Sequence, residues 1–342
     1  MKLLAIGNKP DISFGMQLNL LLRGLNSRGV ETKLLDHEDP LEAKIRTFNS
    51  FNPDVLLIWT FFHDIGHPTI TVDEIKKITG GKRNYLLVAF EVSDTTRISD
   101  KGFFMLESMS PDIFLTPSTW ASSAFKPQPF PVEVLPHALD PVISRVKSGN
   151  KLVLPHVDIY PHVIFVYAQH SPDRKGFDIA ENVITRLEGE RTDFTTIVKT
   201  RDITRTRIKR VYPVAGGLIP ELLFKYYDKA SHFFYPVRGG SFEIPVLEML
   251  ALGKTVIIPE IGAWTDIPLS KDDVYWIKVK TLRRVWKDNP YHVGYMVEPD
   301  ENDAYEKLKQ ALDSPKSVNA AEYEKQYSVE AITEKFLEII KK

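Results

Sequence analysis

Short, uninterrupted apolar runs, each followed by a segment with helical periodicity, are the feature that most constrains the fold of this chain. A first series contains KLLAIG, PDVLLIW, NYLLVAF and DIFLTPS, and a second contains VIFVYA, FTTIVKT, HFFYPV and TVIIPE. Strands that helices cover on both faces read as continuous rather than alternating apolar runs. Strands that alternate with helices predict doubly wound α/β domains, each built around a parallel sheet.

The two series are separated by a Pro-rich region with little periodicity, KPQPFPVEVLPHALDP followed by NKLVLPHVDIYPH. A chain of 342 residues also exceeds what one hydrophobic core usually serves. We therefore predict two Rossmann-like domains, residues 1–150 and 151–327, joined by an irregular linker near 141–160. Ligands of such open sheets bind at the carboxyl ends of the strands, so the expected site is a cleft that the two domains face across.

Composition excludes several kinds of site. The absence of cysteine rules out disulfides, thiolate catalysis and zinc sites built on Cys. The formal net charge of -1 gives the chain as a whole no nucleic-acid footprint. No apolar run approaches the roughly 18 residues of a membrane span, and the apolar run at the N-terminus is too short for a signal peptide. We expect a cytoplasmic protein.

Two polar segments have alternative interpretations. His63 and His67 in HDIGH are spaced i, i+4, which on a helix could bind a metal. Gly66 and Pro68 disfavour a helix and no third ligand is evident, so we expect no metal. The basic segment RDITRTRIKR, residues 201–210, reads most simply as a solvated loop. An anionic acceptor, a membrane surface or a nucleic acid stays open for it, although the lack of interleaved aromatics disfavours single-strand stacking.

The segment RGGSFEIPVLEMLALG, which starts at Arg238, places a carboxylate in a helix that is otherwise apolar nearly all round. Pro245 suits the first turn of this helix and Gly253 its end, which predicts a helix over residues 243–252. Burying an unpaired carboxylate costs several kcal/mol in effective terms. Glu248 must therefore meet either a protein partner or a ligand hydroxyl, and the spacing alone leaves both open.

The glycines and serine before this helix form a second candidate element. Free backbone amides at a helix N-terminus that follows glycines bind anions and polar ligands well. A plain loop of the same composition is common, so the motif by itself is weak evidence. The residues concerned are Gly239, Gly240 and Ser241.

The stretch FEIPVLEMLALGKTVIIPEIGAWTDI resembles the signature of the retaining, family-four-type GT-B glycosyltransferases (glycosyl transferases group 1). That signature reads approximately Glu-Gly-Phe-Gly-Leu-Pro-Val-Leu-Glu-Ala-Leu-Ala-Cys-Gly-Thr-Pro-Val. The resemblance extends over most of the chain, through FLTPSTWASSAF, VEVLPHALDP, DRKGFDIAENVI, IPELLFKYYDKASHFFYP and GYMVEPDENDAYEKLKQAL. SVEAITEKFLEII resembles the terminal helix, residues 328–342, which in that fold packs back on the N-terminal domain. The matching signature positions are Phe242, Pro245, Val246, Leu247, Glu248, Leu250, Ala251, Gly253 and Val256.

The resemblance implies transfer of a sugar from a UDP-, GDP- or ADP-sugar, with retention of anomeric configuration and with neither metal nor cofactor. The acceptor, a glycan, lipid or protein, is expected on the first domain, and peripheral contact with the inner membrane face is left open. By position, Glu248 matches the glutamate that accepts hydrogen bonds from the nucleotide ribose. Lys175 matches the cation that neutralises the diphosphate, with Arg174 beside it.

Several positions depart from the family pattern. Gly240 stands where the first signature glutamate is expected, and Glu243 takes the place of a loop glycine. The usual arginine before Lys175 aligns on His170, so Arg174 or Lys199 could supply its charge. In the first domain Gly15 matches the glycine loop that approaches the donor phosphates. The candidate donor-binding residues are Gly15, His170, Arg174, Lys175, Lys199, Gly239, Gly240, Ser241, Phe242 and Glu248, and the candidate catalytic residues are Glu243, Glu91 and His137.

Two other functions stay open. A nucleotide-sugar epimerase of the GT-B fold is expected to carry a fuller set of acids around the sugar. A binding protein that has kept the fold and lost activity would be consistent with Gly240. The first of the three hypotheses, a retaining glycosyltransferase, accounts for most of the residues above.

Overall fold

The computed structural model describes residues 1–8, 13–60, 70–81, 83–126, 130–169, 171–201, 205–284 and 289–342. Contacts divide the chain into two compact units. Unit 1 comprises Met1–Ala138, Trp286–Gly294 and Tyr327–Lys342, and unit 2 comprises Leu139–Val285 and Tyr295–Gln326. The sequence placed the division at 150/151, but the structure assigns residues 139–150 to unit 2.

Unit 1 contains a six-stranded sheet in the order β2-β1-β3-β4-β5-β6, in which every neighbouring pair is parallel. Each apolar run of the first series forms a strand, as predicted, because its side chains are buried on both faces. The strands are β1 (Lys2–Gly7), β2 (Glu31–Asp36), β3 (Val55–Trp59), β4 (Leu86–Phe90), β5 (Ile113–Thr116) and β6 (Val132–Val134).

Helices pack on this sheet through their apolar faces. One core cluster joins α2, α3 and α4 to β1, β3 and β4. The helices of unit 1 that precede its last segment are α1 (Ser13–Ser27), α2 (Leu41–Phe51), α3 (Val72–Thr79), α4 (Asp100–Met109) and α5 (Thr119–Ala124).

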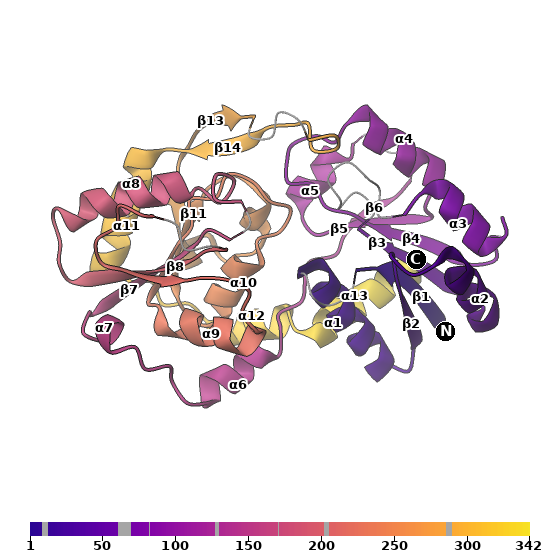
Figure 1. Ribbon diagram of the computed structural model, residues 1–342, viewed down its shortest axis with the longest axis horizontal. Helices are drawn as coiled ribbons and strands as arrows, with labels where there is room; N and C mark the ends of the chain where they lie inside the picture. The colour runs from indigo at the N-terminus through magenta and orange to yellow at the C-terminus, as the bar shows by residue number, and fades with distance from the viewer. Residues whose placement is uncertain are drawn as a thin grey trace. The chain divides into compact units, whose positions relative to one another are not determined.

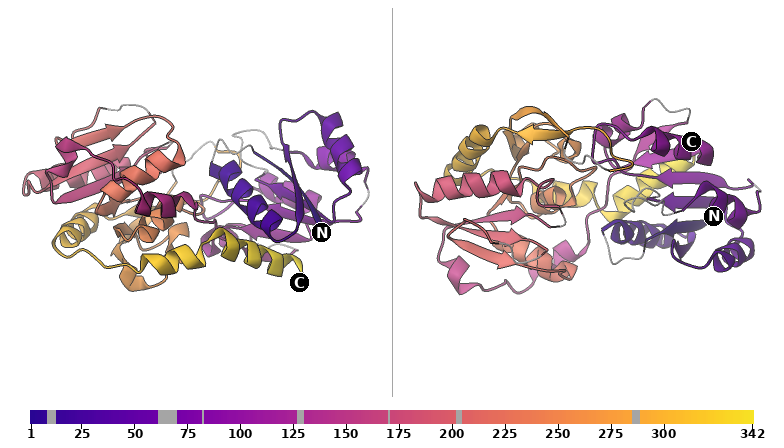
Figure 2. Two further views of the ribbon diagram at one scale, coloured as in Figure 1. Left: turned by 90° about the horizontal axis from the view of Figure 1, so that it is seen from below. Right: turned by 45° about the horizontal axis from the view of Figure 1, so that its top comes forward.

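The last helix, α13 (Val329–Ile340), belongs to unit 1 and packs against α1 (Figure 1). The approach is close at Gly24, where a Cβ would lie less than 3.0 Å from Oγ1 of Thr333. An ion pair between Arg28 and Glu334, 2.6 Å apart, adds to the contact. Both ends of the chain therefore lie in unit 1 (Figure 2).

Unit 2 contains a second six-stranded parallel sheet, in the order β12-β11-β10-β7-β8-β9. The apolar runs of the second series form its central strands, as predicted. GYMVEP also contains a strand, but β14 pairs antiparallel with β13 and does not join the main sheet. The strands are β7 (His162–Tyr167), β8 (Phe194–Lys199), β9 (Val211–Val214), β10 (His232–Phe234), β11 (Thr255–Pro259), β12 (Val274–Ile277), β13 (Val279–Arg283) and β14 (Met296–Pro299).

The segment expected to be an irregular linker, 141–160, contains two short helices instead. Val142, Ile143 and Val146 are buried on the first of them, which packs against α9 of unit 2. That packing explains why the boundary lies earlier than predicted. The helices of unit 2 are α6 (Val142–Ser148), α7 (Pro155–Asp158), α8 (Phe177–Glu188), α9 (Pro220–Lys229), α10 (Ile244–Ala251), α11 (Glu301–Asp313) and α12 (Ala320–Gln326), with 3-10 turns at Ala263–Asp266 and Lys271–Asp273.

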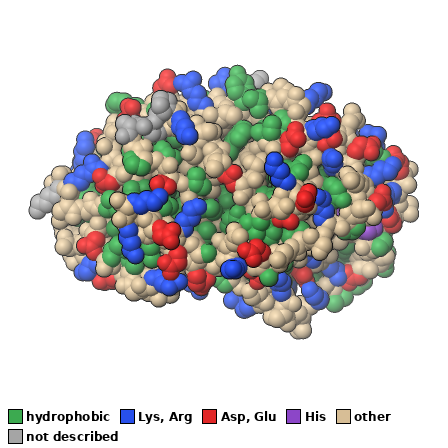
Figure 3. Space-filling model, turned by 180° about the vertical axis from the view of Figure 1, so that it is seen from behind, with side chains coloured by type: hydrophobic (Ala, Val, Ile, Leu, Met, Phe, Trp, Pro, Cys, Tyr) green, Lys and Arg blue, Asp and Glu red, His purple; other side chains and the backbone are tan. Residues whose placement is uncertain are grey.

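Within the described ranges, no helix combines the length and apolar character that crossing a membrane requires. On the face drawn in Figure 3, Lys and Arg side chains are interspersed with Asp and Glu side chains. In the basic segment near 201–210, Arg207 pairs with Glu181 and the guanidinium of Arg210 donates to backbone carbonyls. These two cations are thus engaged within unit 2.

Candidate functional site

Two loops of unit 2 pack directly against each other beyond the carboxyl ends of β7 and β10. The first loop follows β7 and leads into α8, and the second follows β10 and leads into α10. Gly176 ends the first loop with φ +70, and a Cβ on it would lie less than 3.0 Å from the carbonyl oxygen of Pro236. The backbone N–H of Arg238 donates to the carbonyl of Arg174 at 2.8 Å. The two loops therefore position the side chains that they carry relative to each other.

A buried ion pair joins these loops. The Lys175 ammonium donates to both carboxylate oxygens of Glu243, at 2.9 and 2.7 Å, and both side chains are less than a tenth exposed. Nη1 of Arg174 lies 3.3 Å from the same carboxylate and donates to the carbonyl of Gly239 at 2.7 Å. The Tyr235 hydroxyl donates to Oε2 of Glu243 at 2.6 Å. Burial, and then the charge of Glu243, raise the pKa of Tyr235, so the phenol stays a donor.

Gly240 lies under this carboxylate. A Cβ at that position would come within 3.0 Å of both Oε1 and Cδ of Glu243. The structure thus brings together Arg174, Lys175, Gly239, Gly240 and Glu243, all of which the sequence singled out. Their neighbours Ser241 and Phe242 are also buried.

Helix α10 begins and ends as its sequence predicts. Pro245 lies in its first turn, Glu243 is its N-cap residue, and Gly253 follows its end with φ +72. This helix carries Glu248, which is 8% exposed. Burial, assisted by the negative charge of Asp140, raises the pKa of Glu248 to about 8. The carboxyl therefore holds a proton at neutral pH when no ligand is bound.

Among the described residues, Glu248 forms no ion pair. Its polar neighbour is Tyr227, whose proximity partly offsets the rise in the carboxyl's pKa. The hydroxyl of Tyr227 is fully buried and meets no hydrogen-bond partner of ordinary geometry within the described ranges. Within the described ranges no cation pairs with Glu248, and Tyr227 is the polar side chain beside it.

Lys199 is buried but has a different environment. Its ammonium donates to the carbonyl of Thr200 at 3.2 Å and to that of Gly216, and burial lowers its pKa. These contacts hold the loop after β8 and are separate from the Lys175 cluster. His170, the other candidate for a phosphate contact, lies outside the described residues, as do His63 and His67.

The remaining candidates belong to unit 1. Gly15 is buried in the first turn of α1. Glu91 follows β4, is 1% exposed, and accepts the N–H of Val92 at 2.7 Å. Burial lowers the pKa of His137 to about 3, so its imidazole is neutral at physiological pH. Its ring lies 5.6 Å from that of Phe90.

Two further features of unit 1 were not anticipated from the sequence. The Gln17 side chain exchanges two hydrogen bonds with the backbone of Ala138, at 3.0 and 2.8 Å, and so fixes the chain next to His137. Thr60 follows β3 with φ +56, which is a strained conformation for a β-branched residue. Its hydroxyl donates to Asn8 at 3.1 Å. Such strain gathers at functional sites, and here it occurs at the carboxyl end of a parallel strand.

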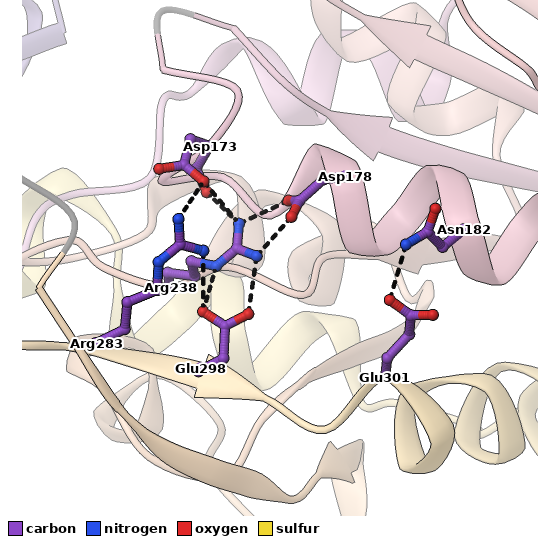
Figure 4. Close-up of polar contacts among 7 residues, drawn as sticks. All are labelled: Asp173, Asp178, Asn182, Arg238, Arg283, Glu298 and Glu301. Atoms are coloured by element: carbon purple, nitrogen blue, oxygen red, sulfur yellow. Dashed lines mark hydrogen bonds and ion pairs between the residues drawn. The ribbon is translucent and has the colours of Figure 1, made fainter.

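Sequence reasoning missed the most extensive ion network of the site, which is centred on Arg238 (Figure 4). This guanidinium is 1% exposed and pairs through two nitrogens with Asp178, at 2.6 and 2.7 Å. It also pairs with Glu298 of β14, at 2.8 and 2.9 Å, and contacts Asp173 at 3.2 Å. Arg283 of β13 forms ion pairs with two of the same carboxylates, at 3.2 Å from Glu298 and 3.4 Å from Asp173.

The network anchors the loop that carries the cations. Asp173 immediately precedes Arg174 and Lys175, and Asp178 lies in the first turn of α8. Arg238 thus holds the loop at both of its ends. The available signal was an arginine directly before the two glycines, and it gave no indication of which carboxylates would surround it.

Metal ligands do not gather in the described part of the chain. No group of three or more His, Asp or Glu side chains there is placed to hold a metal ion.

Comparisons with known proteins identify relatives of this chain and solved structures that share its fold. No model of a protein family matches the chain. It is 35% identical, over 318 residues, to a protein of the Sulfolobus islandicus filamentous virus (isolate Iceland/Hveragerdi) named "Putative glycosyltransferase 45", covering 91% of this chain and 84% of that one. It is 26% identical over 277 residues to "Uncharacterized protein 356" of Sulfolobus islandicus rod-shaped virus 1, covering 75% and 76%.

Solved structures share the fold along the whole chain. The sucrose-phosphate synthase from Thermosynechococcus elongatus superposes with a TM-score of 0.70 at 11% identity, covering 100% of this chain and 98% of that one. An E. coli trehalose-6-phosphate protein bound with UDP-2-fluoro glucose gives 0.69 at 10% identity, covering 100% and 99%. Two parallel six-stranded sheets, the signature around α10 and the viral relative lead to one conclusion: the chain belongs to the GT-B glycosyltransferases of the group 1 type.

Proposed function

We propose that this glycosyltransferase takes its sugar from a nucleotide-sugar that unit 2 binds, retains the anomeric configuration, and needs neither a metal ion nor a cofactor. In the transfer, the bond from the anomeric carbon to the diphosphate breaks and an acceptor hydroxyl oxygen takes its place. The acceptor's proton leaves with the nucleoside diphosphate. The observation that carries the proposal is the meeting of Lys175 and Arg174 with the glycine loop before α10.

Electrostatics supports a role in leaving-group stabilisation. Negative charge grows on the diphosphate as the sugar leaves, and fixed cations in a water-poor site lower the energy of that state by several kcal/mol. Lys175 is 7% exposed, and its loop is anchored by the Arg238 network. Two preorganised cations would supply the charge that a metal ion supplies elsewhere, so we expect transfer to withstand a chelator.

Glu248 is proposed to hydrogen-bond the ribose of the donor. Ribose offers two neighbouring hydroxyls, and within the described ranges no cation pairs with Glu248, whose polar neighbour is the Tyr227 hydroxyl. A related structure was solved with UDP-2-fluoro glucose and another with UDP, which supports a uridine nucleotide as the first ligand to try. The acceptor is proposed to bind unit 1, next to Glu91 and His137.

The test for the cations is the binding of UDP, GDP and ADP, compared with their nucleosides, by calorimetry. For whichever base binds, Lys175→Ala is expected to weaken diphosphate binding at least about tenfold, which corresponds to roughly 1.4 kcal/mol. Nucleoside binding should change little. Lys254→Ala is the matched control, because Lys254 is also carboxylate-paired in unit 2 but precedes the amino end of β11. Equal losses for diphosphate and nucleoside would make Lys175 a structural residue.

The test for Glu248 compares ribonucleotides with 2′-deoxyribonucleotides. Glu248→Gln keeps the shape of the side chain, so the fold should survive while the preference for ribose shrinks. Each hydrogen bond between a neutral carboxyl and a ribose hydroxyl contributes about 0.5–1.5 kcal/mol. A wild-type protein with no preference for the ribose form would show that Glu248 has another role. Slow hydrolysis of one sugar donor from a panel, in the presence of a chelator, would identify the sugar.

A further inference from the structure

The carboxylate of Glu243 occupies the space beside Gly240 into which a side chain at position 240 would have to grow. The group 1 signature has glutamate and then, three residues later, glycine, whereas this chain has Gly240 and then Glu243. Glu243 folds back so that its carboxylate lies where a side chain on Gly240 would begin. Glycine at 240 is therefore what leaves room for the carboxylate of residue 243.

This arrangement places the carboxylate on the cations that a diphosphate would use. Both oxygens of Glu243 accept from Lys175, and Oε1 lies 3.3 Å from Arg174. A phosphate that approached either nitrogen would meet a second negative charge a few ångströms away. Like charges at such separations in a water-poor site repel each other. Lys175 and Arg174 therefore cannot bind Glu243 and a diphosphate at full strength at the same time.

A neutral donor of unit 2 can hold Glu243 once the cations are withdrawn. The Tyr235 hydroxyl donates to Oε2 at 2.6 Å and stays protonated. Glu243 is also the N-cap residue of α10, next to the buried loop residues 241 and 242. A carboxylate released at this point is available to accept hydrogen bonds from hydroxyls of the incoming sugar.

We propose that Glu243 neutralises Lys175 and Arg174 in the empty site and yields them to the diphosphate when the donor binds, an ion-pair exchange that lowers affinity for the free nucleoside diphosphate. The inference rests on the proposed function of unit 2. The exchange would let Glu243 favour the nucleotide-sugar over the free nucleoside diphosphate. The nucleotide-sugar offers hydroxyls to the released carboxylate, and the free diphosphate offers none. Free UDP, GDP or ADP then competes poorly with the sugar donor.

The experiment measures binding of UDP, GDP and ADP to wild type, Glu243→Asp and Glu243→Gln at low ionic strength. For the base that binds, Glu243→Gln is expected to tighten diphosphate affinity about tenfold, a change of roughly 1.4 kcal/mol. Glu243→Asp keeps the charge but is too short to meet Lys175 with both oxygens, so a smaller gain is expected. Nucleoside affinity should not change. Affinity for the sugar donor should rise less than affinity for the diphosphate.

Glu74→Gln is the matched control. Glu74 pairs at 2.7 Å with Lys44, which is 1% exposed, so this change also deprives a buried lysine of its carboxylate, but in unit 1. It should lower thermal stability and leave diphosphate affinity unchanged. If Glu243→Gln does not fold, Glu243→Asp alone decides the matter.

The outcomes separate the two proposals. A wild type that binds none of the nucleoside diphosphates would overturn the proposed function itself. A wild type that binds one of them, with Glu243 variants that bind it equally or more weakly, would overturn the ion-pair exchange alone. If Glu243→Gln raised the affinities for diphosphate and sugar donor equally, Glu243 would compete with the diphosphate for the cations. It would not discriminate between the two ligands, and that part of the proposal would be overturned.

Discussion

A Cβ on Gly176 would lie less than 3.0 Å from the carbonyl oxygen of Pro236, so the loop before α8 and the loop before α10 are in backbone contact. Gly176 also has φ +70, in the left-handed region that favours glycine. Two independent constraints therefore act on one residue, which directly follows Lys175. The contact sets how closely the cation-bearing loop approaches Glu243.

Gly176→Ala should lower the free energy of unfolding by about 3 kcal/mol, because backbone strain and overpacking add. Gly216→Ala is the control, since Gly216 has φ +77 but a Cβ there would meet nothing within 4 Å. Strain alone predicts a loss of about 1 kcal/mol for the control. Urea unfolding measures both. Equal losses would show that crowding against Pro236 contributes nothing.

Arg238→Met should destabilise the protein by about 1.5–3 kcal/mol, because it removes a buried cation that hydrogen-bonds the carboxylates of Asp178 and Glu298. Arg238→Lys should rescue little, since one ammonium cannot form two bidentate pairs. Diphosphate affinity should fall in both variants because the Lys175 loop loses its anchor. Arg207→Met, which breaks an exposed pair with Glu181, should cost less than about 1 kcal/mol. Urea unfolding measures these differences. If Arg238→Met lowered the free energy of unfolding no more than Arg207→Met, Arg238 would not anchor the loop.

Glu248 should make stability depend on pH in the empty protein. Its folded pKa, raised by burial to about 8, exceeds the ordinary value of 4.5. Between these values the folded state holds a proton that the unfolded state releases, so the free energy of unfolding falls as pH rises through this window. Glu248→Gln lacks this titration. The variant should match wild type near pH 5 and exceed it by a few kcal/mol near pH 8.

The measurement is urea unfolding of wild type and Glu248→Gln at pH 5, 6.5 and 8. Glu221→Gln serves as the control, because this glutamate is about half exposed on α9 and pairs only at the surface with Lys225. Its difference from wild type should stay flat with pH. A flat difference for Glu248→Gln as well would mean that Glu248 is ionised in the folded state.

The contact between α1 and α13 can be tested through Gly24 and Thr333. Gly24→Ala alone should destabilise unit 1, because its Cβ would meet Oγ1 of Thr333. Thr333→Ala removes that oxygen, which is buried and meets no hydrogen-bond partner within the described ranges. The double variant should recover part of the loss, because alanine favours the helix by about 1 kcal/mol over glycine, while Cγ1 of Val329 still lies less than 3.0 Å from the new Cβ. Thermal unfolding of the four proteins gives the coupling, and additive effects would contradict the contact.

The sequence by itself determined the elements and their class. The helix predicted over residues 243–252 is observed as α10, Ile244–Ala251, with Glu243 and Leu252 as its cap residues. Continuous apolar runs predicted parallel strands, because burial on both faces makes nearly every residue of a strand apolar. This pattern lies within each strand and does not depend on which strands are its neighbours. The group 1 signature and the burial of Glu248 could also be recognised from the sequence. Both depend on residues that lie close together along the chain.

Only the tertiary structure decided how the charges pair. Lys175 and Glu243 are 68 positions apart, and Arg238 and Glu298 are 60 apart. No local pattern relates such residues, because their distance depends on how strands and loops return to the same edge of a sheet. The same holds for α6, which the sequence indicated only as part of an irregular linker and which packs against α9 of unit 2. The proximity of the Glu243 carboxylate to Gly240 also became visible only in the structure, where a Cβ at position 240 would lie less than 3.0 Å from Oε1 of Glu243.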